Sequence, residues 1–309
     1  MMLAARSCFR SSAASVTRPR AGNDDCRQPW KTFMRFPSTQ TSARRVEDNG
    51  GQFEQQEDLC LVSTQDGIQR IILNNVKKRN VMSLSMMRKL LSIVSAVDQT
   101  TKTIVISANG PVFSSGHDLK ELRAHHGKEK HEEVFRACAD LMCAVEDCSV
   151  PVIAEVKGLA AAAGLQLCAS CDIVVASSDA LFSVPGVNNG LFCSTPGIPL
   201  VRSVPRKIAA KMLFTGDPIT AKEALQAGLV SSVVEKDLLE KETTRIAMRI
   251  CEKSREVIIL GKKFLRAQAQ MSREQAYRNG SKTMVDNLAL ADGQEGITAF
   301  VEKRKPRWA

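Results

Sequence analysis

The residues best placed for chemistry follow a strand-like segment, Val150–Val156, and a turn at Gly158. Five small residues, Ala160 to Gly164, come next, and a helix-compatible stretch leads into Cys171-Asp172-Ile173. Small residues after a strand let another molecule approach the backbone, and the first turn of a helix presents unpaired N–H groups. Because such groups stabilise a developing oxyanion, the segment predicts an oxyanion-binding site. A tightly packed strand–helix junction without a ligand is the alternative.

This segment also resembles a known family signature. The segment resembles the signature of the enoyl-CoA hydratase/isomerase (crotonase) superfamily, which has a polar residue and Gly, three spacers, three Ala/Gly residues and a short helix ending in Cys-Asp-Ile. The resemblance continues in order from about residue 58 to 305. The matching segments are Lys157–Ile173, Asn74–Ser83, Phe113–Leu122, Thr215–Val230 and Gly296–Arg304.

The resemblance implies both a substrate and a set of contacts. Two backbone N–H groups would hold the thioester carbonyl of an acyl-CoA and stabilise the enolate that forms beside it. These donors would be His117 and Ala163, and Asp118 would order the turn next to His117. Lys77, Lys78 and Arg79 would meet the CoA phosphates, and Ser115 to Leu119 would flank the adenine and pantetheine. The full set of implied substrate-binding residues is Lys77, Lys78, Arg79, Val81, Ser115, Gly116, His117, Asp118, Leu119, Lys120, Ala163, Thr195, Phe300 and Lys303.

No cofactor beyond the CoA thioester itself, and no metal, is expected. Phe300 and Lys303 match a C-terminal segment that covers the CoA of a neighbouring subunit. The implied fold is α/β, a crotonase-type spiral of ββα units with a helical C-terminal trimerisation region. The implied assembly is a homotrimer or a dimer of trimers.

The acid–base positions depart from the family pattern. Hydratases of the family carry two glutamates, and these positions hold Gln166 and Gly186 here. A third acidic position, used by dienoyl-CoA isomerase relatives, is Ser194. Positioned acid–base groups each contribute about 10²–10⁴ in rate. Ordinary hydration is therefore not expected, and hydratase/isomerase-like lyase or isomerase chemistry is the most that an enzymatic function would allow.

Three other side chains are candidates to replace the missing groups. His117 has an intrinsic pKa suited to a general base near neutral pH. Cys193 would need an activating base to act as a nucleophile. Glu155 lies on the strand that enters the signature, so its role depends on which face of the sheet it occupies. The sequence does not give that direction.

The elements that must position these residues follow from local patterns. Asp66-Gly67 between two β-rich runs predicts a hairpin. Ser83 is placed to cap an amphipathic helix, and Thr220 with Glu223 forms a capping box before a helix that ends at Gly228. The pattern predicts a buried strand over residues 103–108, a helix over residues 132–148, and a helix that starts with Pro205 and ends at Gly216. From about Glu235 onward the pattern is nearly all helical.

Charge and composition divide the chain. The net charge is +10, and residues 1–45 hold eight Arg and one Lys against Asp24 and Asp25, so that segment alone carries +7. The segment from Met1 to Asn23 is basic, rich in Ser and Ala and free of acids. Such a composition predicts a mitochondrial transit peptide and a matrix location. A basic tail without a targeting role is the alternative. The predicted organisation is a transit peptide over 1–45, a linker over 46–57, an acyl-CoA-binding core over 58–245 and a helical oligomerisation region over 246–309.

The placement of cysteines, apolar residues and basic residues argues against redox or metal chemistry, a membrane span and RNA binding. Cys168-x-x-Cys171 would suit redox or metal chemistry, but no second Cys/His pair completes a zinc site. No apolar run approaches the ~18 residues of a membrane span. One hydratase branch binds RNA through a lysine-rich helix, whereas residues 84–98 carry only Arg88 and Lys89. These are too few for a basic stripe. An enzyme of fatty-acid or lipid metabolism with weak or non-standard chemistry is thus favoured, with a non-catalytic acyl-CoA-binding or regulatory protein as the alternative.

Overall fold

The computed structural model describes residues 58–309. The transit peptide and linker predicted for residues 1–57 lie outside the described residues. The strands are β1 (Cys60–Gln65), β2 (Ile68–Leu73), β3 (Thr103–Ala108), β4 (Val112–Ser114), β5 (Val152–Val156), β6 (Leu159–Ala161), β7 (Ile173–Ser177), β8 (Leu181–Ser183), β9 (Ile219–Thr220) and β10 (Ser232–Val234).

Helices and strands are interspersed as far as residue 234, and only helices follow from there. The longer helices are α1 (Leu84–Ser95), α2 (Gly127–Asp147), α3 (Ala163–Ser170), α4 (Ser194–Ser203), α5 (Arg206–Thr215), α6 (Ala221–Ala227), α7 (Leu239–Cys251), α8 (Arg255–Gln268), α9 (Arg273–Leu288) and α10 (Ala291–Val301). Short 3-10 turns are η1 (Val76–Lys78), η2 (Ala124–His126), η3 (Pro185–Asn189) and η4 (Lys236–Leu238).

The strands form two sheets that the chain visits in turn. One sheet has the order β1-β2-β3-β5-β7-β10 and the other β4-β6-β8-β9. The successive pairs β3–β4, β5–β6 and β7–β8 each place one strand in each sheet and are followed by helices. Within the larger sheet all pairs after the β1–β2 hairpin are parallel. This arrangement is the spiral of ββα units that the family resemblance implies.

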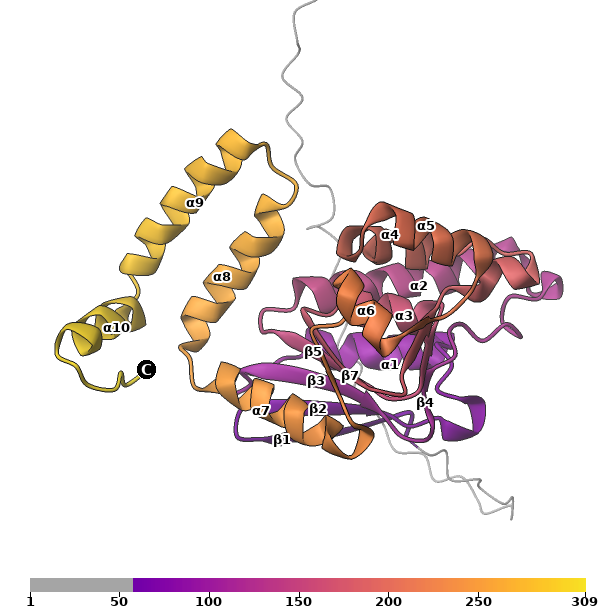
Figure 1. The fold of residues 1–309 in the computed structure, drawn as a ribbon, viewed down its shortest axis with the longest axis horizontal. Coiled ribbons are helices and arrows are strands. Elements are labelled where there is room, and N and C mark those ends of the chain that lie inside the picture. The colour runs from indigo at the N-terminus through magenta and orange to yellow at the C-terminus, as the bar shows by residue number, and fades with distance from the viewer. Residues whose placement is uncertain (1–57) are drawn as a thin grey trace, which may run out of the picture. The chain divides into compact units, whose positions relative to one another are not determined.

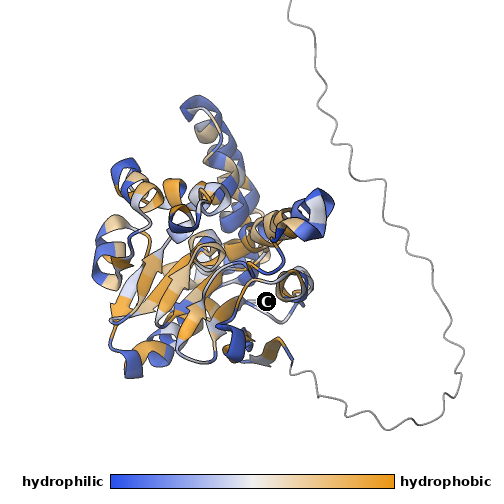
Figure 2. Cartoon of the chain, turned by 90° about the vertical axis from the view of Figure 1, so that its right-hand side faces the viewer, coloured by the Kyte–Doolittle hydropathy of each residue, from blue (hydrophilic) through white to orange (hydrophobic). Residues whose placement is uncertain are grey.

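The larger sheet is covered by helices on both faces (Figure 1). Along β5, Ala154 packs into the main core beneath α1, α2 and α3, whereas Ile153 belongs to a smaller cluster with Leu239 and Ala247 of α7. A strand alternates its side chains between faces, so β5 contributes to both layers. Figure 2 shows the same distribution, with hydrophobic residues along the strands and hydrophilic residues on the outer sides of the helices.

Charged contacts join α8 to the core. The Lys262 ammonium lies 2.6 Å from the Asp172 carboxylate and donates to the Val150 carbonyl at 2.9 Å. Further along α8, the Arg266 guanidinium contacts Glu146 of α2 at 2.6 Å. The last three helices pack on one another, with α8 beside α9 (Figure 1). The predicted boundary between residues 245 and 246 falls inside α7, a helix that packs on the larger sheet.

Most locally predicted elements are present. The hairpin turn has positive φ at Asp66 and Gly67, Ser83 accepts from the Met86 N–H, and the Thr220–Glu223 capping box is formed. Several boundaries differ from the prediction. The helix expected from residue 132 begins at Gly127, and the strand expected from Val150 begins at Val152. Pro205 is the residue before α5 rather than its first residue, because its ψ of 137° is extended.

Candidate functional site

Two loops that are distant in sequence lie side by side at the carboxyl end of β4. The Ser115 N–H donates to the Arg79 carbonyl at 3.1 Å, and the Met82 N–H donates to the Gly116 carbonyl at 2.8 Å. Asn80, 1 % exposed, fixes the first loop by donating through its amide to two backbone carbonyls at 2.9 Å each. The two segments expected to contact CoA therefore form one backbone surface.

The second loop meets the start of α3 at Gly116. A Cβ atom on Gly116 would lie 2.8 Å from the Ala162 Cβ and 3.4 Å from the Ala163 nitrogen. Gly116 has a φ of +89°. Both its conformation and its surroundings therefore require glycine. The N–H groups of His117 and Ala163 donate to no backbone group within residues 58–309. The structure thus brings together the two donors that the resemblance assigns to an oxyanion hole.

The residue just before α3 is held in a strained conformation. Ala162 has a φ of 48° and a ψ of −116°. This combination is uncommon for a residue with a Cβ atom. Its own N–H donates to the Ser183 carbonyl of β8 at 2.9 Å, and its carbonyl accepts from the Gln166 N–H at 2.9 Å. These bonds fix the turn from both sides. Strain of this kind costs about 1–3 kcal/mol and is concentrated at functional sites.

Gln166 lies one turn along α3 and is 4 % exposed. Its Oε1 accepts from the Cys138 thiol of α2 at a distance of 3.7 Å. Burial raises the pKa of the Cys138 thiol to about 12. The thiol therefore stays protonated at neutral pH and can donate a hydrogen bond. The position of the first hydratase glutamate thus holds a neutral amide whose oxygen is already engaged.

The position of the second glutamate has no room for a side chain. A Cβ on Gly186 would lie 2.3 Å from the Leu191 carbonyl oxygen and 2.7 Å from the Cys193 Sγ. The loop closes on this glycine, because the Leu191 N–H donates to its carbonyl and its own N–H donates to the Cys193 Sγ at 3.3 Å. Ser194, the third position, begins α4 and is exposed, with its hydroxyl turned to the Phe192 carbonyl.

The His117 imidazole packs against helix α2. Its Nδ1 lies 3.3 Å from the Met82 carbonyl, and its ring stacks edge-on against Phe135 at 5.3 Å between centroids. Burial lowers the imidazole pKa below its ordinary value, and the Met82 carbonyl opposes this only in part. The ring is thus a neutral Nδ1–H tautomer at neutral pH. Its buried Nε2 has no partner among residues 58–309.

The other two candidate side chains have structural roles. Glu155 points to the α7 face of the sheet, where its carboxylate lies 3.2 Å from Arg70, and Arg70 also donates to Thr244 of α7 at 2.6 Å. Glu155 is thus separated from α3 by the sheet. Burial raises the pKa of the Cys193 thiol, and its sulfur accepts from Gly186. Cys193 is therefore not an activated nucleophile.

The cysteine pair in the signature is buried or partly buried and engaged within its own helix. Cys168 is completely buried, and the Cys171 thiol donates to the Leu167 carbonyl at 3.2 Å. Burial raises the pKa of both thiols well above the ordinary range. Within the described part of the chain no group of three His, Cys, Asp or Glu side chains is arranged to hold a metal ion.

The remaining predicted contact residues fall into two groups. Asp118 orders the turn after His117 by accepting from the Lys120 N–H at 3.0 Å. The predicted contact residues near the two loops and the start of α4 are partly or largely accessible: Lys77, Lys78, Arg79, Val81, Ser115, Asp118, Leu119, Lys120 and Thr195. Phe300 and Lys303 belong to α10 and the turn after it, which pack near α8 and α9. The structure does not bring these two residues to the other contacts within one chain.

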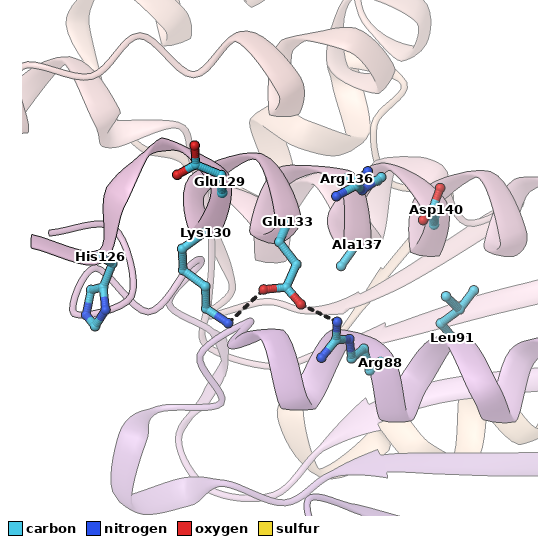
Figure 3. Close-up of a pocket in the computed structure, with 9 residues that line it drawn as sticks. All are labelled: Arg88, Leu91, His126, Glu129, Lys130, Glu133, Arg136, Ala137 and Asp140. Carbon is cyan, nitrogen blue, oxygen red and sulfur yellow. Dashed lines mark hydrogen bonds and ion pairs between the residues drawn. The ribbon is translucent and has the colours of Figure 1, made fainter. Parts of the chain in front are cut away.

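A separate hollow of about 570 Å³ lies between α1 and α2 (Figure 3). Its charged side chains alternate in sign: Glu133 binds Lys130 at 2.9 Å and also Arg88, while Glu129 and Asp140 lie along the same wall as Arg136. A surface for a polyanion needs an excess of cations, and the carboxylates cancel them here. This face carries no basic stripe of the kind that RNA binding requires.

Fold and sequence together define the class of protein. Residues 63–309 match the family model of enoyl-CoA hydratase/isomerase, and the chain belongs to that family. It is 56 % identical over 246 residues to enoyl-CoA hydratase domain-containing protein 3, mitochondrial, of Homo sapiens, covering 79 % of this chain and 81 % of that protein. The crystal structure of the human enoyl-CoA hydratase domain-containing protein 3 superposes with a TM-score of 0.80 and 54 % identity, over 81 % of this chain and 100 % of that one.

Relatives with named reactions are more distant. The 2,3-dehydroadipyl-CoA hydratase of Escherichia coli is 30 % identical over 249 residues, covering 80 % of this chain and 96 % of that protein. The crotonase-type fold predicted from the sequence is confirmed by these comparisons. No helix within residues 58–309 is both long and apolar enough to cross a membrane.

Two features of the site have no counterpart in the sequence-based expectations. Nothing in the sequence singles out Cys138 or Leu191 as a residue of the site. The helical period of residues 132–148 does place Cys138 on the inward face, but its pairing with Gln166 depends on how α2 packs against α3. The Leu191 carbonyl gives no sequence signal, because a backbone group is present at every residue.

Proposed function

We propose that this protein binds acyl-CoA thioesters and polarises their carbonyl group without efficient hydration. The observation that carries this proposal is the meeting of Gly116–His117 with Ala162–Ala163, which leaves two backbone N–H groups unpaired at one place. Two such donors stabilise an enolate oxygen, and losing one costs about 3–4 kcal/mol of barrier in acyl-transfer enzymes.

The missing proton-transfer groups limit the chemistry. Gln166 is neutral, Gly186 is enclosed by its own loop, and Ser194 is exposed on α4. Neither Glu155 nor Cys193 replaces them, because Glu155 pairs with Arg70 on the other face of the sheet and the Cys193 sulfur accepts from the Gly186 N–H. The protein therefore retains the electrostatic half of the family's catalytic device, and we expect weak or non-standard hydratase/isomerase-like chemistry at most.

The cellular setting follows from the relatives. Several similar proteins of vertebrates carry the word mitochondrial in their names. The basic, acid-free start of this sequence supports the same location, and fatty-acid or lipid metabolism is the setting in which acyl-CoA thioesters occur.

Self-association is part of the proposal. The C-terminal helices expose large apolar side chains that no other part of residues 58–309 covers, among them Tyr277 at 76 %, Met284 at 62 % and Phe300 at 85 %. An apolar hollow of about 960 Å³ lies between α8 and α9. Contiguous apolar surface of this kind indicates an interaction site. A trimer or a dimer of trimers would cover it and could bring Phe300 and Lys303 to a neighbour's CoA.

The test is mass spectrometry of acyl-CoA thioesters incubated with the full chain in deuterated water. The panel contains saturated, 2-enoyl and 3-enoyl thioesters of several chain lengths. We expect retention of the thioesters on ultrafiltration and deuterium exchange at the α-carbon, with no substantial addition of water. Gly116→Ala should abolish the exchange, because its Cβ would push the second loop away from the start of α3, whereas Gly197→Ala, which meets only ordinary contacts at 3.5 Å, should not.

The outcomes separate the possible functions. Rapid hydration of a 2-enoyl thioester would show that the acid–base argument is wrong. Retention without any exchange would identify a binding protein that lacks catalysis. If no thioester is retained and none changes, the acyl-CoA proposal fails altogether.

A further inference from the structure

The side-chain amide of Gln166 has its oxygen in a hydrogen bond and its NH₂ group without a partner. Its Oε1 accepts from Cys138, and its Nε2 donates to no group within residues 58–309. The buried side-chain atoms that have no partner and no solvent contact in this part of the chain are Gln69 Oε1, His117 Nε2 and Ser170 Oγ. Gln166 Nε2 also has no partner, but it is not among these atoms, so it keeps some contact with solvent even though the residue is only 4 % exposed. The free donor therefore faces a small open space.

The orientation of the amide is set by the thiol. A glutamine amide offers an acceptor on one side and two donors on the other. The Cys138 thiol, which stays protonated, donates to Oε1 and holds the carbonyl side of the amide toward α2. The NH₂ group is then directed away from α2. A carboxylate at this position would present acceptors on both sides, so the direction of hydrogen bonding in the site is reversed.

The free NH₂ group belongs to the first turn of α3, the helix that begins at the Ala163 donor. Gln166 is three residues after Ala163 on α3, a rise of about 4.5 Å along the axis. Side chains on a helix tilt toward its N-terminus and cover the preceding turn. The amide is therefore aimed back along α3 toward the Ala163 N–H, past which an acyl chain held by its thioester carbonyl would run.

We infer that Gln166 is a specificity-determining residue that selects acyl thioesters carrying an oxygen on C3, that is, 3-oxoacyl and 3-hydroxyacyl thioesters. C3 is the second carbon beyond the thioester carbonyl, so an oxygen there lies beside the carbonyl and within reach of a donor one helical turn away. That oxygen accepts from the Gln166 NH₂. A saturated or 2-enoyl thioester has no acceptor at C3, and its binding would leave the buried donor unpaired.

Cys138 acts in this scheme as a positioning residue. It touches the amide and not the ligand, and its role is to keep Oε1 turned away from the acyl chain. If the thiol is removed, the amide is free to rotate and present its oxygen, which repels a C3 keto oxygen. A hydroxyl at the same position keeps a donor, so Cys138→Ser and Cys138→Ala should differ.

The experiment compares dissociation constants measured by isothermal titration with the full chain. The probes are saturated, 3-oxo, 3-hydroxy and 5-oxo acyl-CoA of one chain length. We expect the 3-oxo and 3-hydroxy thioesters to bind about five- to tenfold more tightly than the saturated one, as one neutral hydrogen bond provides. The 5-oxo thioester, which carries the same oxygen further along the chain, should show no such gain.

The variants are compared by the ratio of the 3-oxo to the saturated dissociation constant. Gln166→Met, similar in shape but without a donor, should bring this ratio to about one. Cys138→Ala should reduce the preference to less than half, and Cys138→Ser should retain it. Gly197→Ala serves as the matched control and should leave the ratio unchanged.

Selection at C3 rests on the proposed acyl-CoA binding, and the two fail in different ways. If none of the four thioesters binds the wild-type chain, the proposed function is wrong and the selection with it. Equal affinities for the saturated and 3-oxo thioesters overturn only the selection at C3. A preference that persists in Gln166→Met overturns the assignment to Gln166. The wild-type comparison needs no variant, so it remains decisive even if a variant does not fold.

Discussion

The closed loop at Gly186 leads to a direct prediction for Gly186→Ala. The added Cβ would lie 2.3 Å from the Leu191 carbonyl oxygen and 2.7 Å from the Cys193 Sγ, both closer than real Cβ contacts. The Leu191 carbonyl belongs to the backbone, so it cannot move aside by a change of rotamer. Displacing the loop also weakens the 2.9 Å hydrogen bond from the Leu191 N–H to Gly186. Overpacking of this kind costs about 1–3 kcal/mol, and with the weakened hydrogen bond we expect a total loss of about 2–3 kcal/mol.

Urea unfolding followed by circular dichroism measures this loss, and a thermal scan should show a decrease in Tm of about 5–10 °C. The matched control is Gly197→Ala, another glycine of this region, whose added Cβ would meet Leu213 at an ordinary 3.5 Å. Its stability should stay nearly unchanged or rise slightly, since alanine favours the helix. Removing the sulfur with Cys193→Ala relieves the 2.7 Å contact but not the 2.3 Å contact. The double variant should therefore recover only part of the loss.

The same geometry predicts that hydration is not restored by returning both glutamates. Gln166→Glu together with Gly186→Glu should give a destabilised protein without hydratase activity, measured as the loss of 2-enoyl thioester absorbance. The first carboxylate fits the site, but the second has no space for its Cβ. The closed-loop argument is wrong if the double variant is as stable as the wild type and hydrates 2-enoyl thioesters more than about 10²-fold faster, the gain that one positioned acid–base group provides.

Three further predictions concern charged and titrating groups. Lys262→Met removes one partner of a largely buried ion pair. It should cost about 3 kcal/mol in urea unfolding. Lys128→Met, from an exposed pair, should leave the unfolding free energy nearly unchanged. Burial lowers the pKa of His117 below its ordinary value. As the pH falls, the unfolded chain therefore takes up this proton at a higher pH than the folded chain. Stability should therefore fall as the pH drops through the window just below about 6.5; His117→Asn should remove that slope, and an unchanged slope would contradict it. Glu155→Gln should leave thioester binding and α-exchange nearly unchanged while lowering stability, because its partner is Arg70 on the α7 side; a large loss of exchange would place Glu155 in the site instead.

The parts of the fold that follow local rules are predictable from the sequence. The hairpin at Asp66-Gly67 and the caps at Ser83 and Thr220 depend on neighbouring residues alone, and the structure has all three. The smaller sheet is not predictable from periodicity, because its strands have only two or three residues each. A period of two needs more residues than that to be recognised, and only the family resemblance implies the spiral.

The site divides in a similar way. The positions of the two N–H donors follow from a motif in which backbone geometry matters more than side-chain identity, and the structure places Gly116 and Ala163 together. The roles of the side chains do not follow, because each depends on a partner from another element. The role of Glu155 is decided only by its sheet face and its contact with Arg70. The pairing of Cys138 with Gln166 joins residues 28 positions apart through helix packing.

The two replaced glutamates differ in their consequences for the chemistry. At Gln166 the shape of the side chain is kept and the direction of hydrogen bonding is reversed, so in the inferred selection at C3 that position still contacts the ligand. At Gly186 the loop occupies the space itself, so no single substitution there supplies a base. Oxyanion stabilisation and binding alone can give about 10³–10⁴ over the reaction in water, whereas each missing acid–base group removes about 10²–10⁴. A site of this kind should therefore exchange an α-proton slowly, with solvent as the base. It should not add water across a double bond, which requires two positioned groups acting together.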